Sequence, residues 1–491
     1  MTLDRLYAAC LACAAACNRR PLLVIIVGGA AYTLMLVAVC ELVLQRFPNS
    51  GDEYVYLYQA ATLGAGRLAN PAPALPEFFD FYYIVQDQGR AFGTFPPGWP
   101  LAIAAARAVG IPPWLLNPLL GTATLLLLWA LGSALHGPRA GVLAAAIAGV
   151  SGFFIFNAAS FFSHTFCGAL LVAAAWCAVR AGRGRTIYPL LVGFLIGWAV
   201  VTRYFTGVVC GLAVIALLVR YVRPRPLGAM ALVAVGGAPW VLFLLAYNLA
   251  LSGNMWRITT TDLTFSAWFA PGFPLRGLDI LSTQILRFLV WTPPALLVAY
   301  FWYLRRGSQD TRRGAIDWLF VVTAVTLIAY LNRGGNQYGP RFYYEAFLFM
   351  LVFVAANLFR ADTLQQADRG TRRMFAAMAV SVAAAPLILA VHAWQARTVV
   401  SERTDLYTRV AANGLRNAVV LVSGRVGTAR PMAARDLTRN GIHYSGSVLF
   451  ALDLGNEENC RLAAAFDRRS LYVYAWDRER RAGNLSPLNC P

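Results

Sequence analysis

Two adjacent carboxylates, Asp52 and Glu53, stand in the stretch NSGDEYVYLYQ directly after a long apolar run. A carboxylate in such a position could act as a general base that takes a proton from an acceptor hydroxyl or amine. A structural role is the alternative, because Ser50 and Glu53 match the S-x-x-E pattern of a helix capping box and Asp52 suits the first turn of that helix. Capping needs only Glu53, so Asp52 is the stronger candidate for the base and Glu53 for positioning the loop or a metal.

Further polar residues interrupt the apolar sequence elsewhere. They are His164 in SFFSHTF, Arg203 in VVTRYF, Asn248 in AYNLAL, and Tyr338, Arg341 and Glu345 in NQYGPRFYYE. Ionisable groups at membrane depth are costly and are functional candidates for that reason. Simpler roles stay open, since His164 could bond a backbone carbonyl at the interface and the arginines could be snorkelling residues.

The composition is that of a protein that crosses a membrane many times. Of the 491 residues 58% are hydrophobic and only 13% are charged, and the mean hydropathy is +0.56. The formal net charge of +19 comes from 42 basic residues, all of them Arg, and many of these stand in short loops between apolar runs. Such charges set membrane topology, so the net charge does not indicate nucleic-acid binding.

Apolar runs long enough to cross a bilayer, about 20 residues, occur about eleven times. We expect the spans at about 22–44, 113–135, 139–158, 161–180, 186–202, 204–221, 227–250, 281–304, 315–332, 342–359 and 374–395. The Arg-rich segments between them all fall on the side of the N-terminus when the spans alternate. The positive-inside rule then predicts a cytoplasmic N-terminus and an extracytoplasmic C-terminus.

With this topology the chain has a transmembrane domain, 1–395, and an extracytoplasmic domain, 396–491. The outward segments are the first loop at 45–112, a loop at 251–280 and the tail. In the first loop EYVYLYQAATLGAGRL could form an amphipathic helix on the bilayer, and the apolar piece at 99–110 is too short to span. All the charged candidates named above map to the outer membrane face.

The tail contains three strand-like runs, AVVLVSG, SVLFALDLG and SLYVYAW, which predict a small α/β domain. Cys460 and Cys490 are the cysteines of this region. They could form a disulfide, because an extracytoplasmic compartment permits one, or they could be two free thiols.

A carboxylate, a histidine and arginines at an outer membrane face are typical of group transfer from a lipid-linked phosphate donor. Arginine presents a planar donor fork suited to the leaving phosphate, and a carboxylate can deprotonate the acceptor. Alternatively, Asp52, Glu53 and His164 could hold a divalent metal ion. The sequence contains no linear metal-binding motif, so the need for a metal stays open.

Several short motifs, in order, resemble those of the GT-C membrane glycosyltransferases, and in particular the group of protein mannosyltransferases and lipid A aminoarabinose transferases. They are GDEYVYLYQA, FPPGWPL, SHT, VVTRY, YNLALSGN and YGPRFYYEAFLF. The resemblance covers about residues 20–395 and leaves the tail unmatched. It implies a mainly α-helical polytopic fold with juxtamembrane helices in the first loop, in a bacterial inner membrane.

The resemblance also implies a reaction, the inverting transfer of a sugar from a polyprenyl phosphate to an acceptor. Asp52 matches the general base of the family, with Glu53 beside it. Arg341 in GPRF is similar to an arginine that binds the lipid phosphate, and Arg203 is a second candidate. His164 stands where many relatives carry a polar or acidic residue. Part of the family uses a lysine for the phosphate, and this chain has none.

We therefore expect a glycosyltransferase that transfers a hexosyl or pentosyl group to a lipid, glycan or protein acceptor at the outer face of the membrane. A transporter or flippase of lipid-linked saccharides is the alternative. It should show polar residues at the bilayer midplane or broken helices in paired halves.

Overall fold

The computed structural model describes residues 2–222, 226–256, 273–306, 314–329, 335–466 and 468–490. The chain divides into two compact units. The helical unit comprises Met1–Val37, Trp114–Ala246 and Thr261–His392, and the mixed unit comprises Ala38–Pro113, Tyr247–Thr260 and Ala393–Pro491. The first loop and the C-terminal part are therefore parts of one unit. Positions 257–272 of the expected loop at 251–280 lie outside the described residues.

Most of the described chain is helical, and the predicted polytopic fold is confirmed. By length and composition, seven described helices could cross a membrane, or up to nine if each of two bent helix pairs is one span. The seven are Pro21–Val43, Pro113–His136 (α6), His164–Ala181 (α9), Tyr204–Tyr221 (α11), Pro226–Ser252 (α12), Arg341–Leu358 and Arg369–Ala412 (α18). Shorter apolar helices, α10 (Ile187–Thr202) and α16 (Leu319–Ala329), lie at two further expected spans.

Two expected spans differ from straight helices. The first is divided into α7 (Pro138–Gly149) and α8 (Gly152–Ala159) with a bend of 70°, and the second into α13 (Phe273–Trp291) and α14 (Ala295–Arg305) with a bend of 115°. The second break falls at the sequence WTPPA. A proline has no N–H for the helix and its ring clashes with the preceding turn, so two in succession end α13.

Among the described helices long enough to cross a membrane, α9 is the second most buried, after the Arg341–Leu358 segment. Of its most apolar 18 residues 78% are buried. It packs against α10, α11 and α17 (Tyr344–Leu358). Glycines bring α10 close to α12: a Cβ atom on Gly193 would lie 2.0 Å from the Val233 carbonyl oxygen. Small residues at such contacts let helix backbones approach closely where both helices are apolar.

In the mixed unit, the first loop folds into α4 (Gly51–Gly64), a small sheet and α5 (Gly98–Ala108). The sheet has the order β1-β3-β2, all antiparallel, from β1 (Asn70–Pro71), β2 (Ile84–Asp87) and β3 (Arg90–Gly93). The two juxtamembrane helices were predicted. An amphipathic surface helix was not the right description of α4, because buried residues occur all around it: Gly51, Glu53, Val55, Tyr56, Tyr58, Gln59, Ala60 and Thr62.

The C-terminal part forms a four-stranded sheet in the order β7-β4-β8-β9. Strands β7 (Val448–Leu452), β4 (Ala418–Val422) and β8 (Ser470–Asp477) are parallel, and β9 (Ala482–Leu488) pairs antiparallel with β8. The first three strands confirm the sequence-based prediction. Strand β9 was not predicted, because its sequence AGNLSPL lacks the apolar alternation of a typical strand.

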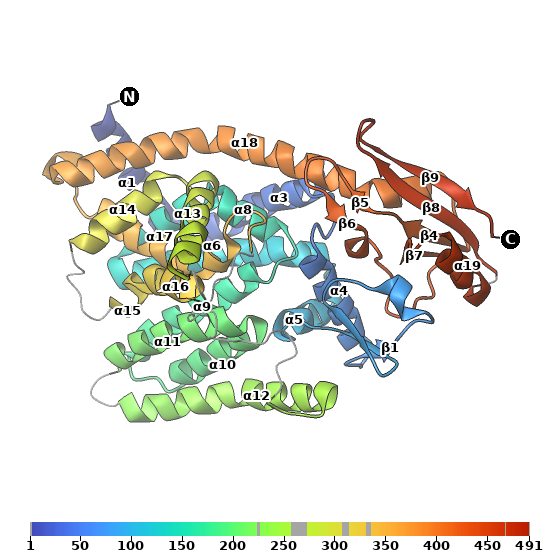
Figure 1. The fold of residues 1–491 in the computed structure, drawn as a ribbon. Coiled ribbons are helices and arrows are strands. Elements are labelled where there is room, and N and C mark those ends of the chain that lie inside the picture. Colours follow the sequence, from blue (N-terminus) through green and yellow to red (C-terminus); the bar gives the residue numbers. More distant parts are fainter. Residues whose placement is uncertain are drawn as a thin grey trace. The chain divides into compact units, whose positions relative to one another are not determined.

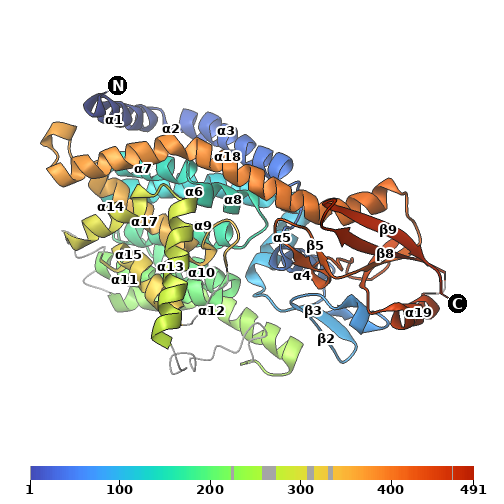
Figure 2. The same ribbon diagram turned by 45° about the horizontal axis from the view of Figure 1, so that its top comes forward.

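Both faces of this sheet are covered (Figure 1). Residues of β4 alternate between two apolar clusters, as side chains of a strand must. One cluster includes Leu406 and Val410 of α18, whose C-terminal end lies beside the sheet in both ribbon views (Figure 2). The other joins Leu462 of α19 (Asn456–Ala465) to Phe78 of the first loop. The first loop therefore contributes to the hydrophobic core of the C-terminal sheet.

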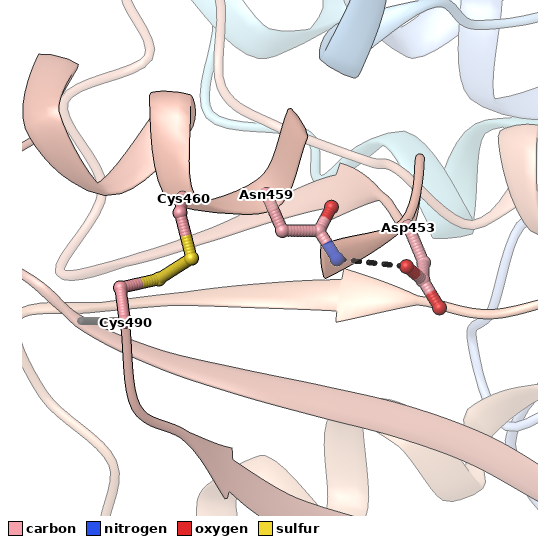
Figure 3. The surroundings of a disulfide bond; sticks show 4 residues. All are labelled: Asp453, Asn459, Cys460 and Cys490. Carbon is pink, nitrogen blue, oxygen red and sulfur yellow. Dashed lines mark hydrogen bonds between the residues drawn. A yellow bond between two sulfur atoms is a disulfide. The ribbon is translucent and has the colours of Figure 1, made fainter. Parts of the chain in front are cut away.

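A disulfide joins Cys460 of α19 to Cys490, with the Cα atoms 5.5 Å apart (Figure 3). The alternative of two free thiols is therefore excluded in this structure. Beside the disulfide, Asn459 Nδ2 donates to Asp453 Oδ1 at 2.8 Å, which ties α19 to the segment that follows β7. Together the two contacts fix α19 to the sheet.

Replacing Cys460 by Ser should lower the free energy of unfolding of the mixed unit by about 3–4 kcal/mol, because the bond restricts the unfolded chain over a separation of 30 residues. Thermal unfolding of the detergent-purified protein measures this. Cys13, an exposed free thiol in α1 (Leu3–Arg19), provides the control, and Cys13→Ser should leave the unfolding temperature unchanged. Labelling of Cys460 by a maleimide without prior reduction would contradict the bond.

Candidate active site

Three of the predicted residues lie where helices of the helical unit begin or end. His164 is the first residue of α9, Arg203 is an extended residue between α10 and α11, and Glu345 lies in the first turn of α17. Arg203 has φ −150° and ψ 92°, so the helix direction changes at this residue. Such junctions expose backbone groups that only buried or water-filled surroundings tolerate inside a membrane protein.

Glu345 brings these junctions together. Its Oε1 atom lies 3.2 Å from His164 Nδ1 and 3.4 Å from Arg203 Nε. The side chains of His164 and Glu345 are 0% exposed and that of Arg203 is 14% exposed. A buried carboxylate is tolerated when partners compensate it. The structure therefore confirms that residues distant in sequence meet here, and excludes a lone interfacial histidine as the description of His164.

A further hydrogen bond and one buried atom without a partner belong to this group. Arg203 Nη1 donates to Ser163 Oγ at 3.2 Å, which holds the guanidinium against the start of α9. The Nε2 atom of His164 is buried and has no hydrogen-bond partner among the described residues. An unsatisfied buried polar atom is unusual in a native fold and calls for an explanation beyond packing.

Arg341 lies on a surface of aromatic rings. Its guanidinium carbon is 4.0 Å from the Phe162 ring centroid and 5.9 Å from that of Phe342, and the guanidinium carbon of Arg203 is 5.2 Å from the Phe342 centroid. Both arginines therefore lie beside the ring of Phe342. Arg341 is 8% exposed. A buried guanidinium over aromatic faces is held in orientation by cation–π attraction.

Tyr338 supports this aromatic surface from the turn before Arg341. It is 4% exposed, and its ring centroid is 6.0 Å from that of Phe162. Its φ angle is +58°, a conformation that non-glycine residues adopt rarely. The Asn157 side chain donates to the Tyr338 carbonyl at 3.3 Å and helps to hold the turn. Such strain is concentrated at functional sites.

The electrostatic balance of this group favours an anion. It contains two guanidinium groups, of Arg203 and Arg341, and one carboxylate, of Glu345, so these residues carry a net positive charge. Arginine suits phosphate oxygens because its planar donors can bind two of them at once. The four residues His164, Arg203, Arg341 and Glu345 are called the arginine cluster below.

The remaining predicted residues belong to the mixed unit. Asp52 and Glu53 lie in the first turn of α4, and Ser50 caps this helix by accepting from the Glu53 N–H at 3.2 Å. The predicted cap is thus present, and Glu53 is 1% exposed. Asn248 lies near the end of α12, where its Nδ2 donates to the Met255 carbonyl at 3.2 Å. The first contact involves the backbone of Glu53, and the second holds the Asn248 side chain against the residues that follow α12.

Three residues near Asp52 were missed by sequence analysis. Arg403, Asp436 and Arg439 contact or face the segment 48–52, although they lie more than 350 positions away along the chain. No short motif marks them, and only the shared fold of the first loop and C-terminal part brings them there. A possible signal was the acid flanked by two arginines in the sequence ARDLTR.

The described residues do not form an evident metal site. Among them no group of three or more His, Cys, Asp and Glu side chains could hold a metal ion. Asp52 and Glu53 belong to the mixed unit and His164 to the helical unit, where its Nδ1 faces Glu345. Among the described residues, the predicted set Asp52, Glu53 and His164 is therefore not one of the groups that could hold a metal ion.

Comparison with known proteins by sequence finds no match, either to a protein family model or to a curated protein. Comparison of structures does find relatives. The crystal structure of ArnT from Cupriavidus metallidurans bound to undecaprenyl phosphate is similar with a TM-score of 0.52 at 11% identity, over 94% of this chain and 98% of that one.

Two further solved structures are less similar. The Archaeoglobus fulgidus oligosaccharyltransferase in complex with Zn and sulfate has a TM-score of 0.49 at 12% identity, over 91% of this chain and 67% of that one. The arabinofuranosyltransferase AftD from Mycobacteria has 0.44 at 13%, over 92% and 35%. The conclusion on the fold is drawn from the first structure, which matches along almost the whole of both chains. The chain has the GT-C fold of multi-pass membrane glycosyltransferases.

Proposed function

We propose that this chain is an inverting glycosyltransferase that uses a polyprenyl-phosphate sugar as donor, with Asp52 as the general base. The observation that carries the proposal is the arginine cluster, in a chain whose fold is similar to that of a protein solved with undecaprenyl phosphate. Ionisable groups at membrane depth are costly and are functional candidates for that reason, and the planar donors of the two guanidinium groups suit phosphate oxygens.

The arginine cluster has the chemistry to hold the phosphate of the donor. Bond cleavage leaves negative charge on the phosphate oxygen, and Arg341 and Arg203 can stabilise that charge by charge-assisted hydrogen bonds. Glu345 and His164 restrain Arg203 from the other side, so the guanidinium is already oriented when the donor arrives. Such preorganisation avoids the cost of ordering the side chain during the reaction.

Asp52 is assigned the proton-transfer step. The acceptor hydroxyl or amine gives its proton to the carboxylate while its lone pair forms a bond to the anomeric carbon of the sugar. The bond from that carbon to the phosphate oxygen breaks, and the electron pair leaves with the polyprenyl phosphate. A single displacement from the opposite side inverts the anomeric configuration. Atoms and charge balance without any further reactant.

The acceptor is a lipid, glycan or protein group that carries a hydroxyl or amine, and the transferred sugar is a hexose or pentose. The reaction would take place at the outer face of a bacterial inner membrane, with the N-terminus in the cytoplasm. This topology is supported by the arginines of the short loops.

A transporter or flippase of lipid-linked saccharides is the second candidate. The two bent helix pairs favour it, because broken helices form the substrate sites of many transporters. Proteoliposomes with a labelled polyprenyl-phosphate sugar distinguish the two. Release of polyprenyl phosphate together with a glycosylated acceptor supports the transferase, and movement of the intact lipid between leaflets without transfer supports the transporter.

Asp52→Asn should lower kcat by about 10²- to 10⁴-fold, the usual contribution of a general base, because the amide cannot accept the proton. The donor affinity should change little. The measurement is single-turnover transfer with labelled donor in detergent. Thermal unfolding checks that the variant is folded as well as the parent protein. Glu53→Gln, next in the sequence, is the comparison, and retained activity of Asp52→Asn would remove Asp52 as the base.

Arg341→Ala should weaken donor binding by about 10- to 100-fold, because it removes charge-assisted hydrogen bonds of about 1.5–3 kcal/mol. Arg341→Lys should recover part of this loss, because it restores the charge without the planar donor fork. The measurement is the donor KM and the direct binding of labelled polyprenyl phosphate, each compared with the acceptor KM.

Arg306→Ala is a matched control for Arg341. Arg306 also lies over an aromatic ring, with its guanidinium carbon 4.7 Å from the Trp302 centroid, but it pairs with Asp368 and its side chain is 45% exposed. Its replacement should leave the donor KM unchanged. Equal effects of the two substitutions would mean that Arg341 has no specific role in binding the donor.

A further inference from the structure

The segment Ala434–Asn440 of the C-terminal part packs on the loop that carries Asp52. Arg439 donates through Nη1 to the Pro48 carbonyl, and Tyr54 Oη donates to the Asn440 carbonyl. Thr438 Oγ1 donates to the Asp80 carbonyl at 3.2 Å. The contacts thus reach the chain before Asp52, the helix that contains it and a later part of the first loop. All of these residues belong to the mixed unit.

Arg439 is buried between aromatic rings of the first loop. It is 9% exposed, and its guanidinium carbon lies 4.5 Å from the Phe47 ring centroid and 5.5 Å from that of Tyr54. A guanidinium fixed by two rings and a backbone carbonyl cannot turn away without losing all three contacts. Arg439 therefore restrains both Phe47, which precedes the segment 48–52, and Tyr54 of α4.

Arg403 of α18 fixes the next residue of the loop. Its Nη1 donates to the backbone carbonyl of Asn49 and, at 2.7 Å, to the Asn49 side-chain oxygen. Arg403 is 6% exposed, so the donors act in surroundings with little water. Two arginines thus hold consecutive carbonyls, those of Pro48 and Asn49, four and three residues before Asp52.

Asp436 lies directly beside the first turn of α4. Its Oδ1 atom is 3.2 Å from the position that a Cβ atom on Gly51 would occupy. Burial raises the pKa of Asp436, the guanidinium groups of Arg439, Arg403 and Arg435 oppose that rise, and the negative charge of Asp52 adds to it. The negative charge of Asp52 is therefore close enough to act on Asp436.

The charged and titratable groups around Asp436 come from each element that packs there. Asp52 belongs to α4, Arg403 and Tyr407 belong to α18, and Arg435 and Arg439 belong to its own segment. Arg435 is also engaged elsewhere, because it lies 3.7 Å from Asp80 and over the Tyr82 ring. Burial is thus the main cause of the raised pKa of Asp436, the three arginines oppose it, and the charge of Asp52 makes the smallest contribution.

We propose that the C-terminal segment Ala434–Asn440 is the positioning element of the catalytic loop, in which Arg439 fixes the backbone before Asp52 and Asp436 places a second carboxylate beside it. This inference rests on the proposed role of Asp52 as base. Asp436 also supplies a negative charge beside the proposed base, opposed by the guanidinium groups of Arg439 and Arg403. The C-terminal part then governs both the position of Asp52 and the charge beside it.

Asp436→Asn tests the electrostatic half of the proposal, because it keeps the shape and removes the charge. The acid limb of kcat against pH should move to lower pH, because the Asp436 carboxyl, whose pKa is raised by burial, no longer titrates there. On the plateau kcat should fall by about 3- to 10-fold, because the negative charge that faces Arg439 and Arg403 has gone. The donor KM should not change. An unchanged pH profile together with an unchanged kcat would overturn this role of Asp436.

Asp453→Asn is the matched control in the same domain. Asp453 also accepts a side-chain hydrogen bond, from Asn459, but it is part of the contact between α19 and the sheet. Its replacement should leave the pH profile in place even if it lowers the unfolding temperature. A shift of the same size in both variants would mean that the effect comes from the stability of the domain.

Arg439→Ala tests the mechanical half. Without the guanidinium the loop before Asp52 loses its anchor, so kcat should fall by about 10-fold or more while the donor KM stays constant. Arg439→Lys should recover less than half of the loss in log kcat, because lysine cannot stack between two rings. Arg480, whose side chain is 85% exposed, is the control, and Arg480→Ala should be fully active. An Arg439→Ala protein with the kcat of the parent would overturn the proposal.

The outcomes also separate this inference from the proposed function. If Asp52→Asn is inactive while the Asp436 and Arg439 variants behave like the parent protein, the base assignment stands and the positioning element fails. If Asp52→Asn is fully active, the proposed base itself fails. For Arg439→Ala, hydrogen exchange of the amides at 49–54 gives a readout that does not depend on activity, and faster exchange there is expected.

Discussion

The helical unit depends on one buried carboxylate, that of Glu345. Its side chain has no exposure and meets the imidazole of His164 and the guanidinium of Arg203. An isolated charge in such surroundings would be prohibitively costly. The three residues come from helix junctions that are distant in sequence, so the compensation of one charge requires all three junctions to be formed correctly. Polar chemistry thus specifies the packing of an otherwise apolar set of helices.

Glu345 also makes the surroundings of the two arginines in the cluster different. Arg203 is neutralised in part by Glu345 and donates to Ser163 Oγ, whereas Arg341 lies over aromatic rings. Aromatic faces orient a guanidinium by cation–π attraction without neutralising its charge. The two arginines are therefore held by different kinds of contact.

The sequence contained much of this arrangement. Long apolar runs predicted the polytopic fold, and four of the polar residues that interrupt them meet in the arginine cluster. The strands β4, β7 and β8 followed from their β-branched and aromatic residues. The bends at Val150–Ser151 and at Thr292–Pro294 were harder to predict, because an apolar run has the same hydropathy whether the helix is straight or broken.

The environment of Asp52 could not be read from the sequence for a different physical reason. The loop at 48–52 is fixed by long-range contacts to Arg403 and Arg439, and the apolar core that aligns them joins Phe78 to Leu462. Neither contact follows from local propensity or from periodicity. A helix cap such as Ser50 is a local feature and was predicted, whereas the partners of Asp52 depend on the tertiary fold of two distant segments.

The dependence on the C-terminal part has a consequence for how this chain could change its acceptor. Asp52, the proposed base, belongs to a segment whose partners lie in the sheet domain, so alterations in that domain can move Asp52. Because proton abstraction is sensitive to displacements of less than about 1 Å, the arginines that hold Pro48 and Asn49 limit which alterations are compatible with activity. Sequence variation that alters acceptor choice is therefore best tolerated in surface segments of the domain that do not contact this loop.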